Sequence, residues 1–447
     1  MKPTASVDIK AFIDARKMSA YQWLVLVLCF AIVTLDGLDT AVMGFVAPVV
    51  MHDWNVSRAA FGPVMGAAMI GLAVGALTAG PASDRIGRKK ILIGSVFCFG
   101  FFSLLCALAQ TPFQLMALRF LTGLGLGAAM PNSTTLLSEY VPSRSRSLLL
   151  TIMFTGFNFG SGLGGFVAAE LLPTFGWRGV FVFCGTLPIL AIPVLLAFLP
   201  ESARLMLVRR VDSRRIANTL GRVAGHVFPG DVRFTAPEPA LSVKAPVKML
   251  FADGYAFSTL MLWLTYFMGL LIIYLLTGWL PTLIRDAGFS VARAATIAGL
   301  FQLGGTVGAV VVGFLMDRMD RNIVIGTAYL LGGVFIFSLG LGSMQSALLP
   351  VLVTAAGFCM SGAQTGLNAL APSCYPTRSR ATGVSWMLGI GRLGGILGSI
   401  VGGTLLSLGF GFATVLSVLA LPAVIAAAAI VTNRLALRFI TTPVVEA

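Results

Sequence analysis

Long apolar runs separated by short polar segments dominate the chain. Each run is close to the roughly 20 residues that a helix needs to cross a hydrocarbon core of about 30 Å. The runs lie near residues 23–47, 61–80, 91–109, 114–137, 147–171, 177–198, 254–284, 291–315, 323–343, 346–370, 381–406 and 410–433. This pattern predicts an all-α integral membrane protein with twelve transmembrane helices. The first run lacks a small-residue cleavage site, so we expect it to remain as an uncleaved span.

One long polar stretch interrupts the pattern at about residues 199–250, and it is rich in arginine and proline. Six apolar runs precede it and six follow it. We therefore predict an N-terminal six-helix bundle over 1–198, a cytoplasmic linker over 199–250 and a C-terminal six-helix bundle over 251–447.

Composition and charge agree with a membrane location. Hydrophobic residues make up 57% of the 447 residues and charged residues 11%, against about 25% charged residues in soluble domains. If both termini are cytoplasmic, nearly all of the 31 Lys and Arg residues lie on the cytoplasmic side; the exceptions are Arg58, Arg119, Arg178, Arg285, Arg293 and Arg392. This positive-inside distribution accounts for the net charge of +14 and argues against nucleic-acid binding.

The two halves of the chain repeat each other. The frame G-x-x-x-D-R-x-x-R occurs at Gly80–Arg88 and again at Gly313–Arg321, 233 positions later (313 − 80). Pro142–Arg146 recurs as Pro376–Arg380 at an offset of 234 (376 − 142). Parallel six-helix repeats around a site at the bilayer midplane are typical of transporters.

Ionisable residues inside the apolar runs mark the candidate site, because each costs about 2.5–3.5 kcal/mol on insertion scales. Asp36 and Asp39 share a face of the first run, one turn apart, and Arg119 of the fourth run should lie at a similar depth to Asp39. A proton on Asp39 would release Arg119, which predicts a proton-coupling site made of Asp36, Asp39 and Arg119. The alternative is that these charges only neutralise one another and serve assembly.

Arg392 lies about 17 Å into the eleventh run, near the midplane. Its planar, bidentate guanidinium suits a substrate carboxylate, although a structural ion pair with Asp36 or Asp39 is the alternative. Aromatic and amide side chains in this run and in others are candidates to complete the substrate pocket: Asn158, Trp263, Tyr266, Tyr274, Gln302, Gln364, Asn368 and Trp386.

The sequence contains no metal, nucleotide or nucleophile motif, and its six cysteines are scattered singly without a CxxC spacing. We therefore expect no cofactor and no metal, and we do not expect an enzyme. A membrane sensor that binds its ligand without moving it is a second class of function. The chain carries no additional signalling domain, which disfavours the sensor.

The motifs resemble those of a known family. Gly80–Lys90 and Arg119–Gly127 resemble the loop 2–3 and span-4 signatures of the major facilitator superfamily. Asp36–Thr40 followed by Gly44–Pro48, and Tyr375–Gly383 leading to Gly389–Arg392, resemble the aromatic acid:proton symporters within it. The resemblance implies a monomer in a bacterial inner membrane that takes up benzoate-like or hydroxybenzoate-like acids together with protons by alternating access. Its partners would be a small aromatic carboxylate, protons and the lipid bilayer; a symporter for a non-aromatic organic acid is the alternative.

The loop signatures imply a different role for a further set of residues at the cytoplasmic ends of the helices. There Gly80 would permit close helix approach, and charged side chains would hold the two halves together in one conformational state. The members of this conformational latch would be Gly80, Asp84, Arg85, Arg88, Glu139, Arg144, Asp317 and Arg378. The alternative is that they form static loop structure.

Overall fold

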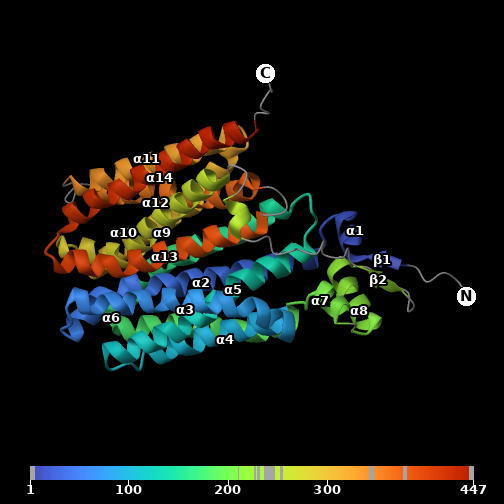
Figure 1. Ribbon diagram of the computed structural model, residues 1–447. Helices are drawn as coiled ribbons and strands as arrows, with labels where there is room; N and C mark the ends of the chain where they lie inside the picture. Colours follow the sequence, from blue (N-terminus) through green and yellow to red (C-terminus); the bar gives the residue numbers. More distant parts are fainter. Residues whose placement is uncertain are drawn as a thin grey trace, which may run out of the picture.

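The computed structural model describes residues 6–209, 211–225, 228, 232–235, 247–251, 255–341, 347–375 and 380–441. Two groups of long, nearly antiparallel helices make up most of the molecule (Figure 1). The first group consists of α2 (Ala20–Asp53), α3 (Arg58–Ile86), α4 (Arg88–Cys106), α5 (Pro112–Tyr140) and α6 (Arg146–Phe198). The second consists of α9 (Tyr255–Asp286), α10 (Val291–Met316), α11 (Arg321–Gly340), α12 (Leu348–Leu370), α13 (Arg380–Ser407) and α14 (Phe412–Thr441).

The described residues contain eleven helices that are long and apolar enough to cross a membrane. One of them, α6, consists of two helices that meet at Gly176, where φ is +64°. Trp177 donates a hydrogen bond to Asp53 at the end of α2, whereas the carbonyl of Phe198 accepts one from Tyr21 near the start of α2. The second part of α6 therefore runs back along α2, and α6 supplies two spans. The prediction of a twelve-span, all-α membrane fold is confirmed.

The repeat found in the sequence is also a repeat of packing. The helices α3 and α10 begin 233 positions apart (291 − 58), and so do α4 and α11 (321 − 88). Gly71 of α3 packs against the carbonyl of Phe120, and Gly304 of α10 packs in the same way against Thr354. In both places a Cβ atom would lie about 2 Å from the backbone oxygen, at 2.1 and 2.2 Å. These positions therefore require glycine.

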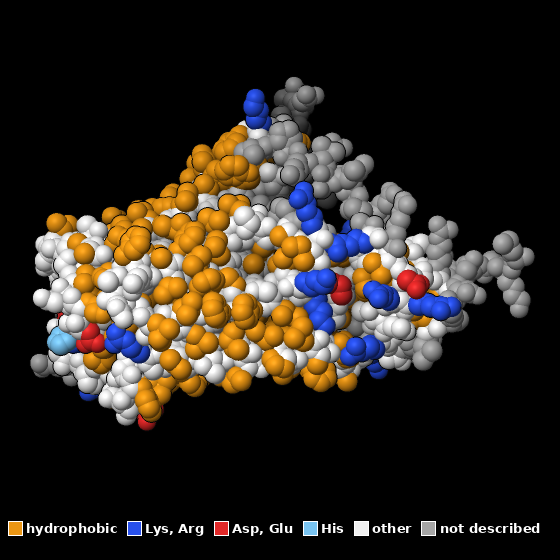
Figure 2. Space-filling model, turned by 90° about the horizontal axis from the view of Figure 1, so that it is seen from below, with side chains coloured by type: hydrophobic (Ala, Val, Ile, Leu, Met, Phe, Trp, Pro, Cys, Tyr) orange, Lys and Arg blue, Asp and Glu red, His pale blue; other side chains and the backbone are white. Residues whose placement is uncertain are grey.

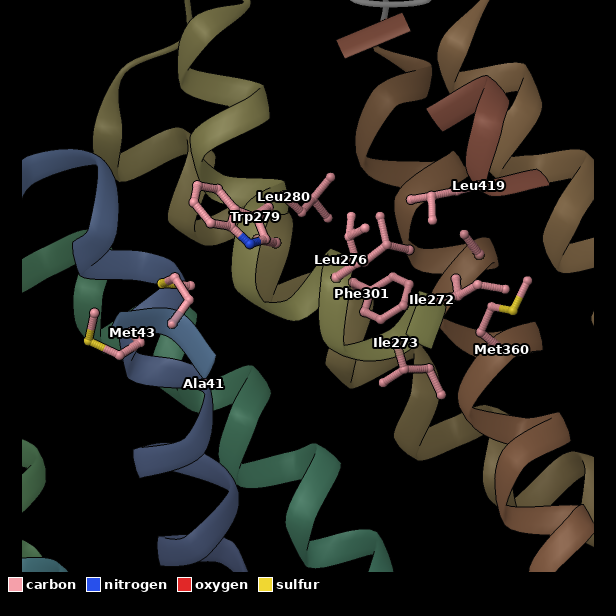
Figure 3. Packing of buried hydrophobic residues seen from close by; sticks show 14 of the residues in the cluster. Ala41, Met43, Ile272, Ile273, Leu276, Trp279, Leu280, Phe301, Met360 and Leu419 are labelled. Carbon is pink, nitrogen blue, oxygen red and sulfur yellow. The ribbon is translucent and has the colours of Figure 1, made fainter. Parts of the chain in front are cut away.

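Buried apolar side chains fill each group and continue across the boundary between them. In Figure 3, Ala41 and Met43 project from α2, while Ile273, Leu276 and Trp279 project from α9. Gly44 of α2 also contacts the backbone of Thr277 in α9. The two groups therefore meet along α2 and α9, as well as where α3 meets α13 and α6 meets α10.

A small structure lies beyond one end of the long helices, on the right of Figure 1. Its helices are α1 (Ile9–Asp14), α7 (Ala203–Val208) and α8 (Ser213–Ala224), and its strands are β1 (Ser6–Asp8) and β2 (Arg233–Thr235), which pair in parallel. A 3-10 turn, η1 (Val247–Leu250), precedes α9, and another, η3 (Ala371–Cys374), follows α12. The buried apolar centre of the small structure contains Ile13, Ile216, Leu220 and Phe234. The segment predicted as a linker therefore carries folded structure that includes the N-terminal residues.

Hydrophobic side chains cover the middle of the face seen in Figure 2, and lysine and arginine side chains gather toward one end of it. Arg85, Arg88 and Lys89 at the junction of α3 and α4 belong to that end, as does Arg144 at the start of α6. We call it the basic end, and the opposite end, where α2 finishes at Asp53, the outer end. An apolar belt between polar ends is the surface expected of a protein that spans a bilayer.

Candidate functional site

A fully buried ion pair joins α2 to α5. Arg119 donates from Nη1 to the Asp39 carboxylate at 2.9 Å and from Nη2 to the Asp39 backbone carbonyl at 3.0 Å. Both side chains have no exposed surface. The structure thus brings together the two charges that the sequence places at similar depth.

The surroundings of this pair hold the Asp39 carboxylate from a second side. Ser103 of α4 donates its hydroxyl to the other carboxylate oxygen at 2.5 Å, and the ring of Phe181 from α6 lies 6.0 Å from the Arg119 guanidinium. Nε of Arg119 is buried and has no hydrogen-bond partner among the described residues. Because one donor of the guanidinium remains unsatisfied, the pair is not a fully satisfied network.

Asp36 lies one turn from Asp39 but has different neighbours. Its side chain is 1% exposed and accepts a hydrogen bond from Thr40 at 3.3 Å. Among the described residues it takes part in no ion pair, although Arg392 and Tyr274 lie within electrostatic range. The two carboxylates share a stretch of α2, yet Asp39 faces the interior of the first group and Asp36 faces the second group.

Arg392 on α13 reaches across the boundary between the groups. Its Nη1 donates to the backbone carbonyl of Leu72 in α3 at 3.0 Å, and the side chain is half-buried. Tyr266 and Tyr274 of α9 lie within electrostatic range of its guanidinium. The residues that face Arg392 thus come from both groups.

The amide candidates Gln302 and Gln364 are both buried in the second group. Nε2 of Gln302 donates to the Thr277 hydroxyl at 2.7 Å, and its Oε1 has no partner among the described residues. Oε1 of Gln364 accepts from the Tyr329 hydroxyl at 2.6 Å, and its Nε2 lacks a partner within the same set. Each side chain is therefore fixed at one end and has one unused hydrogen-bonding group.

The remaining pocket candidates are more exposed. Asn158 on α6 is half-buried and Asn368 on α12 is exposed. Trp386 is 44% exposed and stacks on Trp263, with ring centroids 5.9 Å apart. The structure does not bring Trp386 to the Asp39–Arg119 pair.

At the basic end, Arg88 and Glu139 form an ion pair inside the first group. Glu139 also accepts from the Ser202 hydroxyl at 2.5 Å. The neighbouring carboxylate, Glu201, accepts from the backbone N–H groups of Arg88 and Lys89 at the start of α4, at 2.9 and 3.2 Å. Gly87 has φ of +120°, and a Cβ atom there would lie 2.5 Å from Glu201. Arg88 and Glu139 therefore tie α4 and α5 to the segment after α6.

Other members of the predicted latch have separate surroundings. Arg144 donates to the Arg16 carbonyl at 2.9 Å, and Ser143 donates from its backbone and its hydroxyl to Asp14. Partial burial opposes ionisation of Asp14, but these hydrogen bonds and the nearby charges of Lys10 and Arg146 together lower the pKa of its carboxyl group. The side chains of Arg85 and Asp317 are exposed.

The close helix approach expected at Gly80 is not seen in this conformation, because a Cβ atom there would meet nothing within 4 Å. Its neighbours leave open space on that side of α3, whereas Gly71, further along the same helix, contacts α5 directly. The side chain of Asp84 and all of Arg378 lie outside the described residues.

Polar contacts also join the two groups at the outer end. Arg58 of α3 forms an ion pair with Asp286 of α9 at 2.6 Å. Arg285 donates to the carbonyl of Pro48 in α2. These contacts lie at the outer end, and the Arg392–Leu72 hydrogen bond joins the two groups at mid-depth. No group of three His, Cys, Asp or Glu side chains in the described ranges is placed to hold a metal ion.

Comparison with known proteins identifies the family. The model of the Major Facilitator Superfamily matches residues 28–399 and 262–446. A gallate transporter of Pseudomonas putida is 59% identical over 99% of this chain and 98% of its own. The 4-hydroxybenzoate transporter PcaK of Pseudomonas aeruginosa is 53% identical over 96% of each. The chain belongs to the aromatic acid transporters of the major facilitator superfamily. It is therefore a transporter and not an enzyme.

Solved structures agree on the fold. The inward open conformation of the xylose transporter XylE from E. coli matches with a TM-score of 0.71 at 19% identity, covering 91% of this transporter and 95% of that chain. A bacterial homologue of the lysosomal transporter Spinster, in an inward-facing and occupied conformation, matches with a TM-score of 0.66 at 19% identity, covering 95% and 97%.

Several side chains in this transporter's site carry no signal in the sequence. Ser103, Thr40 and Thr277 contact the key charges or amides, but isolated Ser and Thr residues are ordinary in membrane helices. Glu201 belongs to the Pro200–Arg204 loop after the sixth run, and its position after a proline gave no indication that it holds the start of α4. Only the three-dimensional contacts single these residues out.

Proposed function

We propose that this transporter takes up an aromatic carboxylic acid together with protons by alternating access. The proposal is supported by the names of its relatives, which are transporters of gallate and of 4-hydroxybenzoate. The observation that carries it is a cation at mid-depth, Arg392, which contacts one group of helices from the other and lies near the buried carboxylate Asp36. A carboxylate substrate bound there would contact both groups, as a site that alternates between two sides requires.

The carboxylate of the substrate binds the guanidinium of Arg392. Only one of the five guanidinium donors is used in the hydrogen bond to Leu72, so the group can turn its bidentate edge to the acid. Tyr266 and Tyr274 flank the bound ring from α9. Asn158, Gln302, Gln364, Asn368 and Trp386 remain proposed pocket residues.

Proton coupling involves the two aspartates of α2 in different ways. Asp36 is buried without an ion-pair partner among the described residues, so it gains and loses the transported proton. Asp39 is paired with Arg119, and protonation of Asp39 frees Arg119 to move. Because the unpaired Arg119 charge is costly in a dry interior, the change in protonation biases the helices toward the other conformation.

The transporter lies in the bacterial inner membrane as a monomer, with both termini and the basic end on the cytoplasmic side. The outer-end contacts of Arg58 and Arg285 then close the periplasmic side of the substrate site. Arg88 and Glu139 belong to the proposed latch at the cytoplasmic side, with Gly80, Asp84, Arg85, Arg144, Asp317 and Arg378. The halves 1–198 and 251–447 move about the site, and residues 199–250 connect them.

Uptake into proteoliposomes tests the proposal. Purified transporter is reconstituted, and accumulation of radiolabelled 4-hydroxybenzoate is followed with and without an inward-directed proton gradient. Accumulation above equilibrium that requires the gradient is expected. Equilibration of the substrate across the membrane without accumulation would refute proton coupling. Specific binding without any uptake would favour a sensor.

A symporter for a non-aromatic organic acid is the second candidate. Excess unlabelled benzoate should suppress uptake, whereas an aliphatic dicarboxylate should not. The opposite pattern of competition would favour the second candidate.

A further inference from the structure

A small pocket lies between the two groups, with α2, α3 and α5 on one side and α9 and α13 on the other. The free space inside it is about 20 Å³. A buried water molecule requires about 10–15 Å³ of such space. The pocket is therefore of the size that holds one water molecule, and it is too small for a substrate ring.

The wall of this pocket is not purely apolar. Thr40 and Arg119 line it from the first group, and Thr277 and Ser399 line it from the second. Thr40 is 7% exposed and Arg119 is 0% exposed. Apolar cavities in proteins stay empty, whereas buried waters occupy sites that offer two to four hydrogen-bonding partners. The lining thus favours a bound water molecule over an empty pocket.

Arg119 has an unused hydrogen-bond donor. Its Nη1 and Nη2 donate to Asp39, but its Nε is buried and has no partner among the described residues. A buried donor of a charged group is costly when it is left unpaired. A water molecule in the pocket can accept from Nε and so complete the hydrogen bonding of the guanidinium.

Two threonine hydroxyls can accept hydrogen bonds from the same water molecule. The Thr40 hydroxyl donates to the Asp36 carboxylate at 3.3 Å, so its oxygen is available as an acceptor. On the opposite wall, the Thr277 oxygen accepts from Nε2 of Gln302 at 2.7 Å and has a second lone pair. A water between the two walls can therefore donate one hydrogen to each threonine.

We infer that this pocket binds one ordered water molecule, which accepts from Nε of Arg119 and donates to the hydroxyl oxygens of Thr40 and Thr277. Through Thr40, the water connects the carboxylate of Asp36 to the Asp39–Arg119 pair and to the second group. The inference deepens the proposed function and rests on it, since it takes Asp36 as the residue that gains and loses the transported proton.

The charged and titratable side chains near Asp36 come from three helices. They are Asp39 on its own helix, Arg392 on α13 and Tyr274 on α9. Thr40 is the side chain that donates a hydrogen bond to the Asp36 carboxylate. A change in the charge of Asp36 therefore changes the hydrogen bonding of Thr40 directly.

Protonation of Asp36 reverses part of the hydrogen-bond chain. The incoming proton stays on the carboxyl group, whose new O–H group donates to the Thr40 oxygen. The Thr40 hydroxyl then turns its hydrogen to the water, which accepts from both Thr40 and Arg119. Both hydrogens of the water become available to the second group, where the hydroxyl oxygens of Thr277 and Ser399 can accept them. Protonation thus strengthens the contact between the two groups and favours the conformation in which they are closed over the pocket.

A structure that resolves ordered waters tests the binding site, by electron cryomicroscopy of the wild type and of Gly278→Ala. Gly278 and Met65 both line the pocket, and a Cβ atom at Gly278 would lie 3.1 Å from Cε of Met65 and meet nothing else within 4 Å. The added methyl group therefore takes up the space of the water and leaves every polar side chain in place. Density for one oxygen within hydrogen-bonding distance of Thr40 and Arg119 is expected in the wild type and not in Gly278→Ala.

Spin labels at the outer end measure the conformational effect. His52→Cys in the first group and Leu408→Cys in the second are exposed labelling sites, and pulsed electron resonance gives the distance between them. Asp36→Asn supplies an uncharged side chain that can donate to Thr40, as the protonated carboxyl group does. It should raise the ratio of closed to open molecules by about threefold or more, the effect of one hydrogen bond. In Gly278→Ala and in Thr40→Val, the same substitution should change the ratio by less than about 1.5-fold.

Two further variants serve as controls. Thr40→Ser keeps the hydroxyl, and Gly313→Ala adds a methyl group to α10 where a Cβ atom would meet nothing within 4 Å. Both should keep the oxygen density and the effect of Asp36→Asn. If Thr40→Val does not fold, the result with Gly278→Ala decides the question.

The results distinguish the inference from the proposed function. Absence of the oxygen density in a wild-type map that shows other buried waters would overturn the inference. So would an Asp36→Asn effect that is missing in the wild type, or that is equally large in the wild type, Gly278→Ala and Thr40→Val. Each of these results would leave proton-coupled uptake of aromatic acids intact. Uptake of 4-hydroxybenzoate by the wild type that does not depend on a proton gradient would instead overturn the proposed function, whether or not the water is seen.

Discussion

At the scale of single residues, the two aspartates of α2 differ in what holds their charge. Asp39 has a guanidinium and a serine hydroxyl as partners, whereas Asp36 has a threonine hydroxyl. Asparagine has the same shape as aspartate but cannot carry a proton. We expect Asp36→Asn and Asp39→Asn each to abolish accumulation driven by a proton gradient in proteoliposomes. Asp39→Asn should also lower stability, since removing one partner of a buried pair costs about 3–5 kcal/mol.

Asp53→Asn is the matched control for this experiment. It changes an aspartate of the same helix that accepts a hydrogen bond from Trp177 at the outer end, remote from the pair. It should accumulate substrate like the wild type. Accumulation by both Asp36→Asn and Asp39→Asn would refute the assignment of proton coupling to α2.

Substitution of Arg392 tests the proposed contribution of its guanidinium to substrate affinity. The loss of a hydrogen-bonded partner from a desolvated carboxylate costs about 2–5 kcal/mol, or roughly 30- to several-thousand-fold in affinity. Arg392→Ala should lose affinity for 4-hydroxybenzoate by that factor in calorimetry, at a pH where the acid is ionised. Arg392→Lys keeps the charge without the bidentate geometry and should fall between Arg392→Ala and wild type.

Arg293→Ala provides the comparison, because Arg293 lies near the outer end of α10 with its guanidinium over the ring of Phe289. The affinity of Arg293→Ala for 4-hydroxybenzoate should equal that of the wild type. Wild-type affinity in Arg392→Ala would show that another cation binds the carboxylate, and the candidate is Arg119, which lines a small pocket between the two groups.

At the scale of helices, α3 shows what a glycine does in two settings. A Cβ atom at Gly71 would lie 2.1 Å from the Phe120 carbonyl oxygen of α5, whereas one at Gly80 would meet nothing within 4 Å. Gly71→Ala should therefore separate α3 from α5 and lower the unfolding temperature in detergent. Gly80→Ala should leave that temperature unchanged or raise it, since alanine favours a helix by about 1 kcal/mol over glycine. Equal temperatures for the two variants would contradict the role of Gly71 in helix contact.

The sequence could predict where the spans lie along the chain, but not which face of each helix packs against a neighbour. Apolar runs located the spans closely: the run at 291–315 corresponds to α10 (Val291–Met316) and the run at 323–343 to α11 (Arg321–Gly340). Run length and hydropathy depend on the bilayer, which acts on every span alike. Which face of α3 meets a neighbour depends on tertiary packing, and a glycine in a motif carries no information about it. The sequence also did not predict the pairing of β1 with β2. Each strand has only three residues, and its partner lies over 200 positions away in the chain.

The residues of the candidate site likewise fall into those that the sequence could predict and those that it could not. Charges within apolar runs are costly, so Asp36, Asp39, Arg119 and Arg392 could be found from the sequence, and the depth of Asp39 and Arg119 placed them near each other. Ser103 and Thr277 could not be found, because a hydroxyl can bond its own helix backbone at little cost and is common in spans. The partial exposure of Trp386 could not be predicted either, since an aromatic ring suits lipid, core or pocket alike.

At the scale of the whole molecule, polar contacts join the two groups at the outer end, and in the proposed mechanism they close that side of the site. The Arg58–Asp286 ion pair joins the two groups, with side chains 40% and 34% exposed. A surface pair of this kind contributes at most about 1 kcal/mol, so its loss should change the ratio of the two conformations by up to roughly fivefold. We therefore expect Asp286→Asn to increase the fraction of transporter that is open at the outer end. The site is then reached from outside more often, without a change in its chemistry.

Thiol labelling measures this fraction. The six native cysteines are free and mostly buried. Met65 lines a small pocket between the two groups, so Met65→Cys places a reporter cysteine there. In oriented vesicles, a membrane-impermeant thiol reagent added on the outer side should label Met65→Cys faster when Asp286→Asn is also present. Arg434→Gln is the matched control, because it breaks the Arg434–Asp320 ion pair within the second group and leaves Asp320 to cap α11. It should not change the labelling rate. Equal rates for Asp286→Asn and Arg434→Gln would show that the Arg58–Asp286 pair does not hold the outer end closed, and would leave Arg285 and the packing of α2 on α9 as what closes it.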